Sequence, residues 1–533
     1  MIVESHYDAV VVGGGHNGLV AAAYLARAGQ SVLVLERGES FGGAAASKAI
    51  FPGLDARISR YSYLVSLLPS AIVVDLGLRF ASRRRAIASC TPYDRNGEAS
   101  ALLMSNVDEA RSAASFQARA GAADWRGYQA LADSRQALAS RIWPSLLRPL
   151  QSRARWTASL ETTTERAAWD AFVERPLGEV IERSVQDDLV RGLLFTDAKI
   201  GILTHPHDPT LLQNRCFLVH VTGQGTGEWQ VPVGGMGALA DTLVASAREA
   251  GARLIKLATV ESIHPGSPRH TVGLRLAGDD REFAIEATRV LVNAGPRVFA
   301  RLLGQPWVSR SADEGSVCKV NLLLRRLPRL RADVEASDAF CGTFHVDESY
   351  SGMQNSYQQA AAGQIPERPP FELYCHTLTD PSILSPALRE AGYHTLTLFG
   401  LDAPYKLFEA DHDETRAELL RHYVRALNAH LAEPIEDCLA VDAEGNACVE
   451  VKTPRDLERE LTMDRGNIFH GELSWFFADE ADLEGSWGVE TPYERIYRCG
   501  SSATRGGGVS GIPGHSAARR IFEELGLTGG FSA

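Results

Sequence analysis

This 533-residue chain lacks an excess of positive charge and lacks paired cysteines, and each absence excludes a class of function. Its formal net charge is −12 at pH 7. Because a nucleic-acid-binding protein needs a basic face to contact phosphates, we expect no nucleic acid as a main partner. The 8 cysteines are scattered without a C-x-x-C pair or another metal-ligand spacing. This pattern predicts a reduced, cytoplasmic chain with neither a redox-active disulfide nor a bound metal.

Long hydrophobic runs are also missing. The most apolar long stretch, Tyr61 to Leu78, contains Pro69 and Asp75 and is too polar to cross a bilayer. The residues before the first apolar segment do not form a basic-then-apolar export signal, so we expect a cytoplasmic location. The stretch from Tyr61 to Leu78 instead predicts an apolar helix broken near Pro69, which either packs in the core or forms one wall of an apolar substrate tunnel.

Lysine is scarce relative to arginine. The 54 basic residues include only Lys48, Lys199, Lys256, Lys319, Lys406 and Lys452 as lysines. Biased codon usage explains most of this ratio, but it makes each lysine worth examining. The remaining composition, 45% apolar and 23% charged, is typical of a soluble globular enzyme, and the length is sufficient for two or three domains.

A glycine motif near the N-terminus organises the rest of the chain. The apolar run from Ala9 to Val12 predicts a buried strand, and Gly13, Gly15 and Gly18 follow it with the spacing G-x-G-x-x-G. These glycines permit a tight turn, a close approach of a pyrophosphate and close packing of the next helix. That helix, from about Asn17 to Ala28, would direct its positive N-terminal end at the phosphates.

An acidic residue follows at the distance expected of a ribose-binding carboxylate. Ser31 to Leu35 reads as a second strand, and Glu36 at its end lies 18 residues after Gly18, near the offset of about 20 residues at which an acid accepts hydrogen bonds from a ribose. Arg37 could contact a 2′-phosphate, but Glu36 would repel that group, which leaves NADP the second choice. The motif therefore predicts a dinucleotide-binding site.

The run E-R-x-x-x-x-G-G, from Glu36 to the pair Gly42-Gly43, resembles the second signature of the flavoprotein family that contains phytoene desaturase, carotenoid isomerase and monoamine oxidase. This resemblance favours FAD over NAD as the cofactor. It implies an α/β fold: a discontinuous, Rossmann-like FAD-binding domain of the glutathione-reductase/amine-oxidase type, with an inserted α+β substrate domain.

Two later segments resemble further cofactor-facing regions of the same family. Val231 to Pro296 contains a Gly-Gly-x-Gly turn, a helix and two apolar strands, and Ile496 to Leu525 contains a short strand, a glycine loop and a helix. With Asn467 to Phe477, these blocks look closest to the phytoene-desaturase-like branch that includes pyridine nucleotide-disulphide oxidoreductase domain-containing protein 2. The cofactor contacts that the motif and the resemblance imply are Gly13, Gly15, Asn17, Gly18, Glu36, Arg37, Gly42, Gly43, Val260, Ala294, Gly295, Gly500, Gly508 and Val509.

The chain therefore leaves and re-enters the FAD-binding domain. The segments between the motifs would be a mostly helical insertion and a sheet-and-helix region of the substrate domain. Trp143 and Trp156 alternate with arginines in the first insertion, a pattern that packs on the core or lies on an anionic membrane surface, so peripheral membrane contact is an expectation. The predicted order is a first FAD-binding segment (1–82), the helical insertion (83–227), a second FAD-binding segment (228–303), the substrate sheet and helix (304–461) and a third FAD-binding segment (462–533).

Three side chains are candidates for catalysis. Lys319 lies in GSVCKV, which is similar to the monoamine oxidase strand whose lysine holds a water next to flavin N5. His470 and His515 fall inside family motifs that approach the flavin, where an imidazole could transfer a proton. The alternative for each residue is a structural role, as a surface lysine or a hydrogen-bonded core histidine.

The resemblance implies an FAD-dependent oxidoreductase of the desaturase type, which moves hydride from a small apolar or amphipathic substrate to flavin N5. Because no second dinucleotide motif is present, we expect reoxidation by oxygen or a quinone. An amine oxidase, a non-redox double-bond isomerase that uses reduced FAD, and a non-catalytic lipid-binding protein like the Rab GDP dissociation inhibitors are the alternatives. The sequence leaves the substrate and the oligomeric state open.

Overall fold

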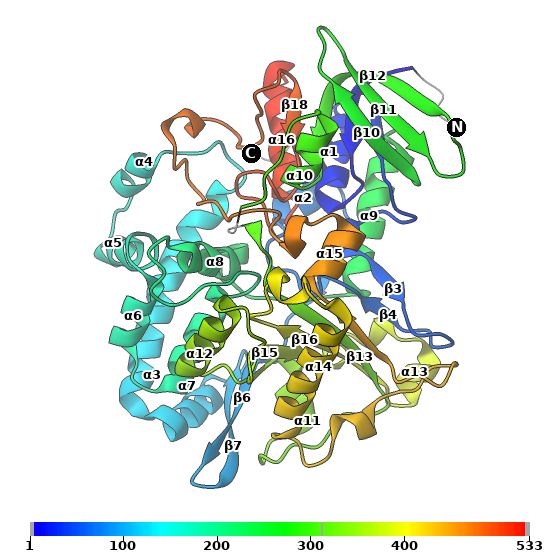
Figure 1. The fold of residues 1–533 in the computed structure, drawn as a ribbon. Coiled ribbons are helices and arrows are strands. Elements are labelled where there is room, and N and C mark those ends of the chain that lie inside the picture. The colour runs from blue at the N-terminus through cyan, green and yellow to red at the C-terminus, as the bar shows by residue number, and fades with distance from the viewer. Residues whose placement is uncertain (1–4, 311–312, 528–533) are drawn as a thin grey trace.

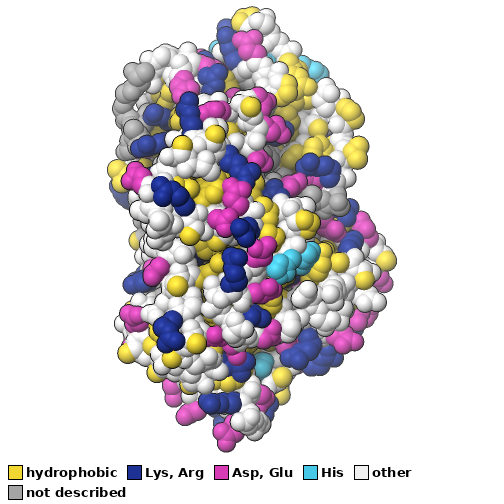
Figure 2. Space-filling model, turned by 90° about the vertical axis from the view of Figure 1, so that its left-hand side faces the viewer, with side chains coloured by type: hydrophobic (Ala, Val, Ile, Leu, Met, Phe, Trp, Pro, Cys, Tyr) yellow, Lys and Arg dark blue, Asp and Glu magenta, His cyan; other side chains and the backbone are white. Residues whose placement is uncertain are grey.

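Two large sheets and a helical region make up the computed structural model, which describes residues 5–310 and 313–527 (Figure 1). One sheet lies at the top of the view in Figure 1 and the other near the bottom, with the helices α3 to α8 beside them. Within the described residues, no helix is both long and apolar enough to span a membrane. On the face shown in Figure 2, acidic and basic side chains are interspersed.

The first sheet is built from three segments far apart in the sequence. Its central strands are parallel, and their buried runs of Val, Ile and Leu are typical of a sheet covered on both faces. In Figure 1 the blue, green and red regions of the chain meet here. In spatial order the strands are β10 (Ala258–His264), β11 (His270–Leu276), β12 (Glu282–Val292), β1 (His6–Val12), β2 (Val32–Leu35) and β9 (Arg253–Ile255), with β18 (Ile496–Arg498) also paired to β12.

Three helices, one from each of these segments, pack together beside this sheet. α1 (His16–Arg27) starts at Gly15 and presents a small-residue surface that lets its neighbours approach closely. α9 (Gly235–Glu249) and α16 (Ile512–Glu524) lie against it, and the shared core includes Leu19, Leu239 and Ile521. The chain thus returns twice to its N-terminal unit, as the order of the motifs predicts. Short elements nearby are β3 (Ser47–Ala49), β4 (Arg57–Ser59), β5 (Ser82–Arg83), β8 (Val231–Pro232), α2 (Ser70–Asp75) and α10 (Pro296–Leu302).

The second sheet lies at the other end of the molecule from the first sheet and its glycine motif (Figure 1). Its neighbours are antiparallel except for β14 and β6, which pair in parallel. α11 (Ala336–Cys341), α13 (Pro386–Glu390), α14 (His412–Asn428) and α15 (Pro454–Leu461) accompany it. The strand order is β17 (Val449–Lys452), β13 (Cys318–Leu324), β16 (His394–Gly400), β15 (Phe371–Tyr374), β14 (Thr343–Val346), β6 (Ile87–Arg95) and β7 (Glu98–Ser105).

The hairpin formed by β6 and β7 departs from the sequence expectation. It belongs to the second sheet, although it falls in the segment 83–227 that the sequence predicts to be mostly helical. Asn96 and Gly97, both with positive φ, make its two-residue turn. Asn-Gly is the strongest short-range hairpin signal, so the sequence did contain the information.

The rest of that segment is helical as expected. α3 (Glu109–Ile142) is interrupted by a kink at Gly121. Trp156 is buried and stacks on Trp169, so the aromatic side of the arginine-rich stretch faces the core. The other helices here are α4 (Arg153–Ala158), α5 (Thr163–Trp169), α6 (Leu177–Ser184), α7 (Asp188–Phe195) and α8 (Leu212–Val221), with α12 (Tyr350–Ala361) packed on α7.

The predicted helix between Tyr61 and Leu78 is wrong in its first half. Only α2 is helical, and it begins after Pro69, which cannot continue a helix from the preceding residues. The first half is instead an irregular segment that lines a large cavity between the two sheets, with Tyr61, Tyr63 and Leu64 in the cavity wall. This placement agrees with the interpretation of the stretch as a cavity wall.

Candidate functional site

A cavity of about 720 Å³ lies between the two sheets and the helical region. Its lining includes the glycine turn, the ends of β2, β10 and β12, the C-terminal glycine loop, and residues of the second sheet. This size is in the range of pockets that hold cofactors and drug-sized ligands. One cavity therefore connects the predicted cofactor motifs with the predicted substrate domain.

The glycine turn is shaped by close backbone approaches. A Cβ on Gly18 would lie 2.4 Å from the carbonyl oxygen of Gly13, a distance that backbone atoms cannot relieve. Gly13 has φ of +97°, and a Cβ there would lie 2.6 Å from the carbonyl oxygen of Asn293. The turn thus holds the start of α1 against β1 and β12, as the motif predicts. The first N–H groups of α1 have no partners within the helix, so they are free to bind an anion.

Glu36 stands where the ribose-binding acid is expected. The backbone N–H groups of Gly14 and Gly38 donate to its two carboxylate oxygens at 2.7 and 2.6 Å. These bonds fix the carboxylate beside the glycine turn, with further lone pairs open to the cavity. Arg37 also lines the cavity, but its guanidinium donates to the carbonyl oxygen of Glu460.

The remaining cofactor candidates divide into two groups. Those that line the cavity are Gly13, Gly15, Asn17, Glu36, Arg37, Gly43, Val260, Ala294, Gly508 and Val509. Those that lie behind the lining and shape the backbone around it are Gly18, Gly42, Gly295 and Gly500. The structure therefore brings the three predicted segments to one cavity.

Several buried polar atoms at this end of the cavity lack a partner within the protein. They are Nε2 of His16, Oδ1 of Asn17 and Nδ1 of His470. Because buried polar groups are nearly always hydrogen-bonded, these atoms fit a polar ligand that supplies the missing bonds. The free helix N-terminus, the fixed carboxylate and the unpartnered atoms together match an anionic dinucleotide with a polar ring, so the residues present fit FAD.

Asn293 and His16 are site residues that sequence reasoning missed. The amide of Asn293 donates to the carbonyl oxygen of Gly13 at 3.1 Å, and both residues line the cavity. Asn293 is the first residue after the apolar run of β12, a position that could have identified it. Burial lowers the pKa of His16 to about 4, so its imidazole is neutral at pH 7.

Lys319 lies on β13 and lines the cavity, where its Nζ donates to the carbonyl oxygen of Ser59 at 2.6 Å. Nζ is 4.8 Å from the ring centre of Tyr63. Burial holds the pKa of this lysine well below its usual value. The side chain is thus a buried amine in the cavity wall and not a solvent-exposed surface lysine.

The structure separates the two candidate histidines. His470 lines the cavity with positive φ, and burial lowers its pKa to about 4. His515 does not reach the cavity lining. It lies on α16 and packs edge-on against Tyr24, with ring centres 5.4 Å apart, and near Trp487. His515 is therefore positioned to hold α16 against α1, because its ring is buried between these helices.

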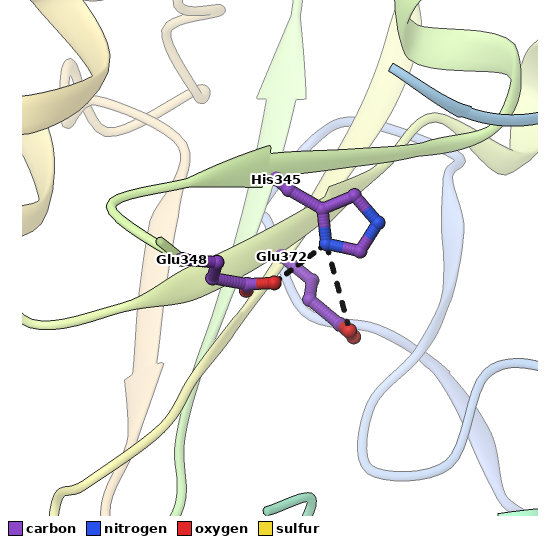
Figure 3. A group of neighbouring side chains, drawn as sticks. All are labelled: His345, Glu348 and Glu372. Atoms are coloured by element: carbon purple, nitrogen blue, oxygen red, sulfur yellow. Dashed lines mark hydrogen bonds and ion pairs between the residues drawn. The ribbon is translucent and has the colours of Figure 1, made fainter. Parts of the chain in front are cut away.

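A second polar group lies on the substrate-domain side of the cavity, and sequence reasoning did not identify it. His345 on β14 and Glu372 on β15 line the cavity, with Glu348 beside them (Figure 3). Nδ1 of His345 lies 2.6 Å from a carboxylate oxygen of Glu348 and 3.9 Å from one of Glu372. The signal that could have revealed the group is a charged residue inside each of two apolar strands, FELY and TFHV.

Comparisons with known proteins agree with this geometry. Residues 11–71 match the model of an NAD(P)-binding Rossmann-like domain, and residues 111–442 match that of the flavin containing amine oxidoreductases. An uncharacterized protein of Mycobacterium tuberculosis is 46% identical over 97% of both chains. Pyridine nucleotide-disulfide oxidoreductase domain-containing protein 2 of Rattus norvegicus is 31% identical over 98% of this chain and 94% of that protein.

More distant similarities extend to an isomerase and to solved oxidases. Chloroplastic prolycopene isomerase of Arabidopsis thaliana is 25% identical over 56% of this chain and 46% of its own length. The structure of putrescine oxidase bound to putrescine superimposes with a TM-score of 0.55 at 18% identity, covering 98% of this chain and 99% of that one. This likeness shows the fold. With the family model spanning more than half of the chain, the protein is an FAD-dependent oxidoreductase of the flavin-containing amine oxidoreductase family.

Proposed function

We propose that this oxidoreductase dehydrogenates an amphipathic organic substrate to a carbon–carbon double bond, as a desaturase does. The observation that carries the proposal is the single cavity, which joins the FAD-binding motifs to a mixed wall from the substrate domain. That wall contains Leu131, Leu194 and Phe217, which suit a hydrocarbon. It also contains a few buried polar groups, which suit one polar end of a ligand.

The cofactor, when bound, accepts two electrons and a hydrogen as hydride from the substrate. The chain's own residues hold and enclose the reactants. The glycine turn and Glu36 fix the dinucleotide end, and Ala294, Gly508 and Val509 line the path toward the substrate domain. Tyr63 and Lys319 stand on the opposite wall. Lys319 is buried and Tyr63 is half-buried, so this part of the wall is shielded from bulk water.

The electron acceptor in this proposal is oxygen or a quinone. A second G-x-G-x-x-G with an acid at the right distance is absent from the sequence. An acceptor that enters the same cavity or reaches its rim would therefore take up the electrons.

An isomerase is the second candidate. A relative named prolycopene isomerase supports it, because that protein is 25% identical over 311 residues. Such an enzyme would require reduced FAD and consume no electrons. The lipid-binding alternative without a cofactor has less support, since the glycine turn, Glu36 and the unpartnered polar atoms all fit FAD.

An amine oxidase is a further candidate, compatible with the family and with the aromatic lining of the cavity. Its usual aromatic cage would need several aromatic side chains near the flavin. The lining does contain such side chains: the ring of Tyr63 lies 5.0 Å from that of Tyr374 and 5.8 Å from that of Phe399, between ring centres.

The test is a screen for compounds that reduce the bound cofactor. Purified holoprotein is mixed anaerobically with amphipathic alkanes, alkenes and amines of graded size, and bleaching of the flavin absorption is followed by stopped flow. The desaturase proposal predicts bleaching by compounds with adjacent C–H bonds and no amine. Bleaching by amines alone would replace it with an amine oxidase. Turnover only by pre-reduced enzyme would replace it with an isomerase.

A further inference from the structure

We propose that Glu372 accepts the proton that the substrate loses during dehydrogenation, and that the ion pair of His345 and Glu348 behind it determines when its carboxylate is ionised. The inference rests on the proposed function and assigns the proton-accepting group of the same site. Glu372 is suited to this role because it lines the cavity and is 2% exposed, so a substrate would meet its carboxylate out of contact with bulk water.

The oxygens of Glu372 are held by neutral donors. The hydroxyl of Thr196 donates to one carboxylate oxygen at 3.2 Å, and the phenol of Tyr374 donates to the other. Among the described residues, the cationic group within ion-pair distance of Glu372 is His345, at 3.9 Å. The carboxylate is thus oriented by hydrogen bonds and is not neutralised by a close arginine or lysine.

His345 is engaged more closely with Glu348 than with Glu372. Its Nδ1 lies 2.6 Å from Glu348, which is itself 2% exposed, and the other oxygen of Glu348 has no hydrogen-bond partner (Figure 3). Two buried carboxylates therefore share one imidazole. The cluster contains one more acid than it has cations to pair, so it can hold one additional proton.

The surroundings favour that proton on Glu372. Burial first, and then the nearby negative charge of Glu348, raise the pKa of Glu372 to about 7. Burial acts to lower the pKa of His345, but the charge of Glu348 and its hydrogen bond outweigh burial and raise that pKa above its usual value. The other titratable or charged groups that face the cluster from neighbouring elements are Asp197, Tyr63, Tyr374 and Arg85, and His376 stacks on the ring of Tyr374.

A histidine and two carboxylates at this spacing also resemble a metal centre, but the bonds within the cluster oppose that interpretation. A cation would need the carboxylate oxygens of Glu372 and Glu348 as ligands. Those oxygens already accept hydrogen bonds from Thr196, Tyr374 and His345. A hydrogen-bonded acid–base group fits these contacts better.

The proposed dehydrogenation breaks two C–H bonds on adjacent carbons of the substrate. One C–H bond of the substrate breaks with transfer of hydride to oxidised FAD, which is the two-electron acceptor. The adjacent C–H bond breaks with transfer of its proton to a carboxylate oxygen of Glu372, and its electron pair forms the second bond of the C=C group. A base whose pKa lies near the working pH is efficient in such a transfer. The proton then passes to water when the product leaves the cavity.

The first arm of the test measures the ionisation of Glu372 directly. Infrared difference spectra of the holoprotein are recorded between pH 5 and pH 9 in wild type, E372Q and E182Q. Glu182 is a matched control, because it also bonds a histidine, His207, and a tyrosine, Tyr350, but is partly exposed and outside the cavity lining. We expect a carboxyl band that titrates near pH 7 in wild type and E182Q and is absent in E372Q. Persistence of that band in E372Q would reject the proposal.

The second arm measures the role in catalysis. With any compound that bleaches the wild-type flavin, E372Q should bind FAD and melt like wild type, yet reduce the flavin about 10²–10⁴-fold more slowly. Its rate should lose the rise near pH 7, and acetate should restore some of the rate in E372A. Unchanged reduction by E372Q would overturn the proton-accepting role alone. If no compound reduces the wild-type flavin, the proposed function fails and this role fails with it. A stoichiometric divalent metal that is lost in H345Q would also overturn the proposal.

Discussion

The side-chain amide of Asn293 donates a hydrogen bond to the carbonyl oxygen of Gly13 at 3.1 Å, across 280 residues of sequence. This bond joins the end of β12 to the glycine turn and defines the shape of the FAD-binding end of the cavity. Asn293 also lies within 3.0 Å of where a Cβ on Gly15 would be, so it fills the space beside the turn.

Replacing Asn293 by alanine should loosen this junction. The loss of this part-buried hydrogen bond costs about 1 kcal/mol, because the carbonyl of Gly13 loses its side-chain donor. We expect a lower melting temperature and FAD binding weakened by about tenfold or more, measured by titrating the apoprotein with FAD. Asn446→Ala, on the exposed loop near β17, is the control and should change neither quantity. Unaltered FAD affinity in N293A would show that the turn keeps its shape without this bond.

Gly18→Ala should abolish the close contact between α1 and β1. Its Cβ would lie 2.4 Å from the carbonyl oxygen of Gly13, and that oxygen belongs to backbone held by the sheet. The helix must shift, so we expect a loss of FAD together with destabilisation of about 1–3 kcal/mol. Gly278→Ala serves as control, because it places a Cβ at positive φ in a turn with no atom within 4 Å. That variant should lose about 1 kcal/mol and keep its FAD.

Lys319→Met should stabilise the protein at neutral pH. Burial lowers the pKa of Lys319 in the folded state, whereas the unfolded chain takes up a proton on this lysine up to about pH 10.5. The free energy of unfolding therefore rises as the pH increases from the pKa of Lys319 in the folded state toward its pKa in the unfolded chain. The same contribution is lost as the pH falls back through this range. Denaturant unfolding at pH 7 and pH 9.5 should show this rise in wild type and a smaller rise in K319M. Lys48→Met, at an exposed position, should leave the wild-type slope unchanged.

His470 and His515 should respond differently to substitution. Because His470 lines the cavity and has an unpartnered Nδ1, H470A should shift the absorption spectrum of bound flavin and weaken its binding. H515A should leave that spectrum in place and lower stability by about 1–3 kcal/mol, since it removes an aromatic contact with Tyr24. A spectral change in H515A as large as that in H470A would contradict the assigned positions.

The glycine turn, Glu36 and the C-terminal glycine loop could be located from the sequence, because their geometry is determined over short sequence distances. Gly13, Gly15 and Glu36 belong to one strand–turn–helix–strand unit, in which spacing alone determines their relative positions. The same holds for α16 and its preceding glycine loop. These elements were predictable because the contacts that define them involve neighbours in the sequence or a motif with a single geometry.

The polar group of His345, Glu348 and Glu372 could not be located in this way. Glu372 and His345 meet because β15 pairs with β14, and Thr196 joins them from the helical region 176 residues earlier in the chain. The sequence places a titratable residue inside each of the two apolar strands, but it contains no local signal for the pairing of these strands or for the contact with Thr196. The apolar composition of Tyr61 to Leu78 predicts a helix broken near Pro69, but the tyrosines of its first half line the cavity in an irregular segment, so tertiary packing overrides local propensity there.

The cofactor content of the purified protein is the most informative single measurement, because every functional step above requires FAD in the cavity. We expect a yellow protein whose denatured supernatant contains FAD at about one molecule per chain, and an E36A variant that releases most of it because the ribose contact is lost. A colourless protein that takes up no added FAD, or one that binds NAD in the same cavity, would contradict the assignment of this cavity to FAD.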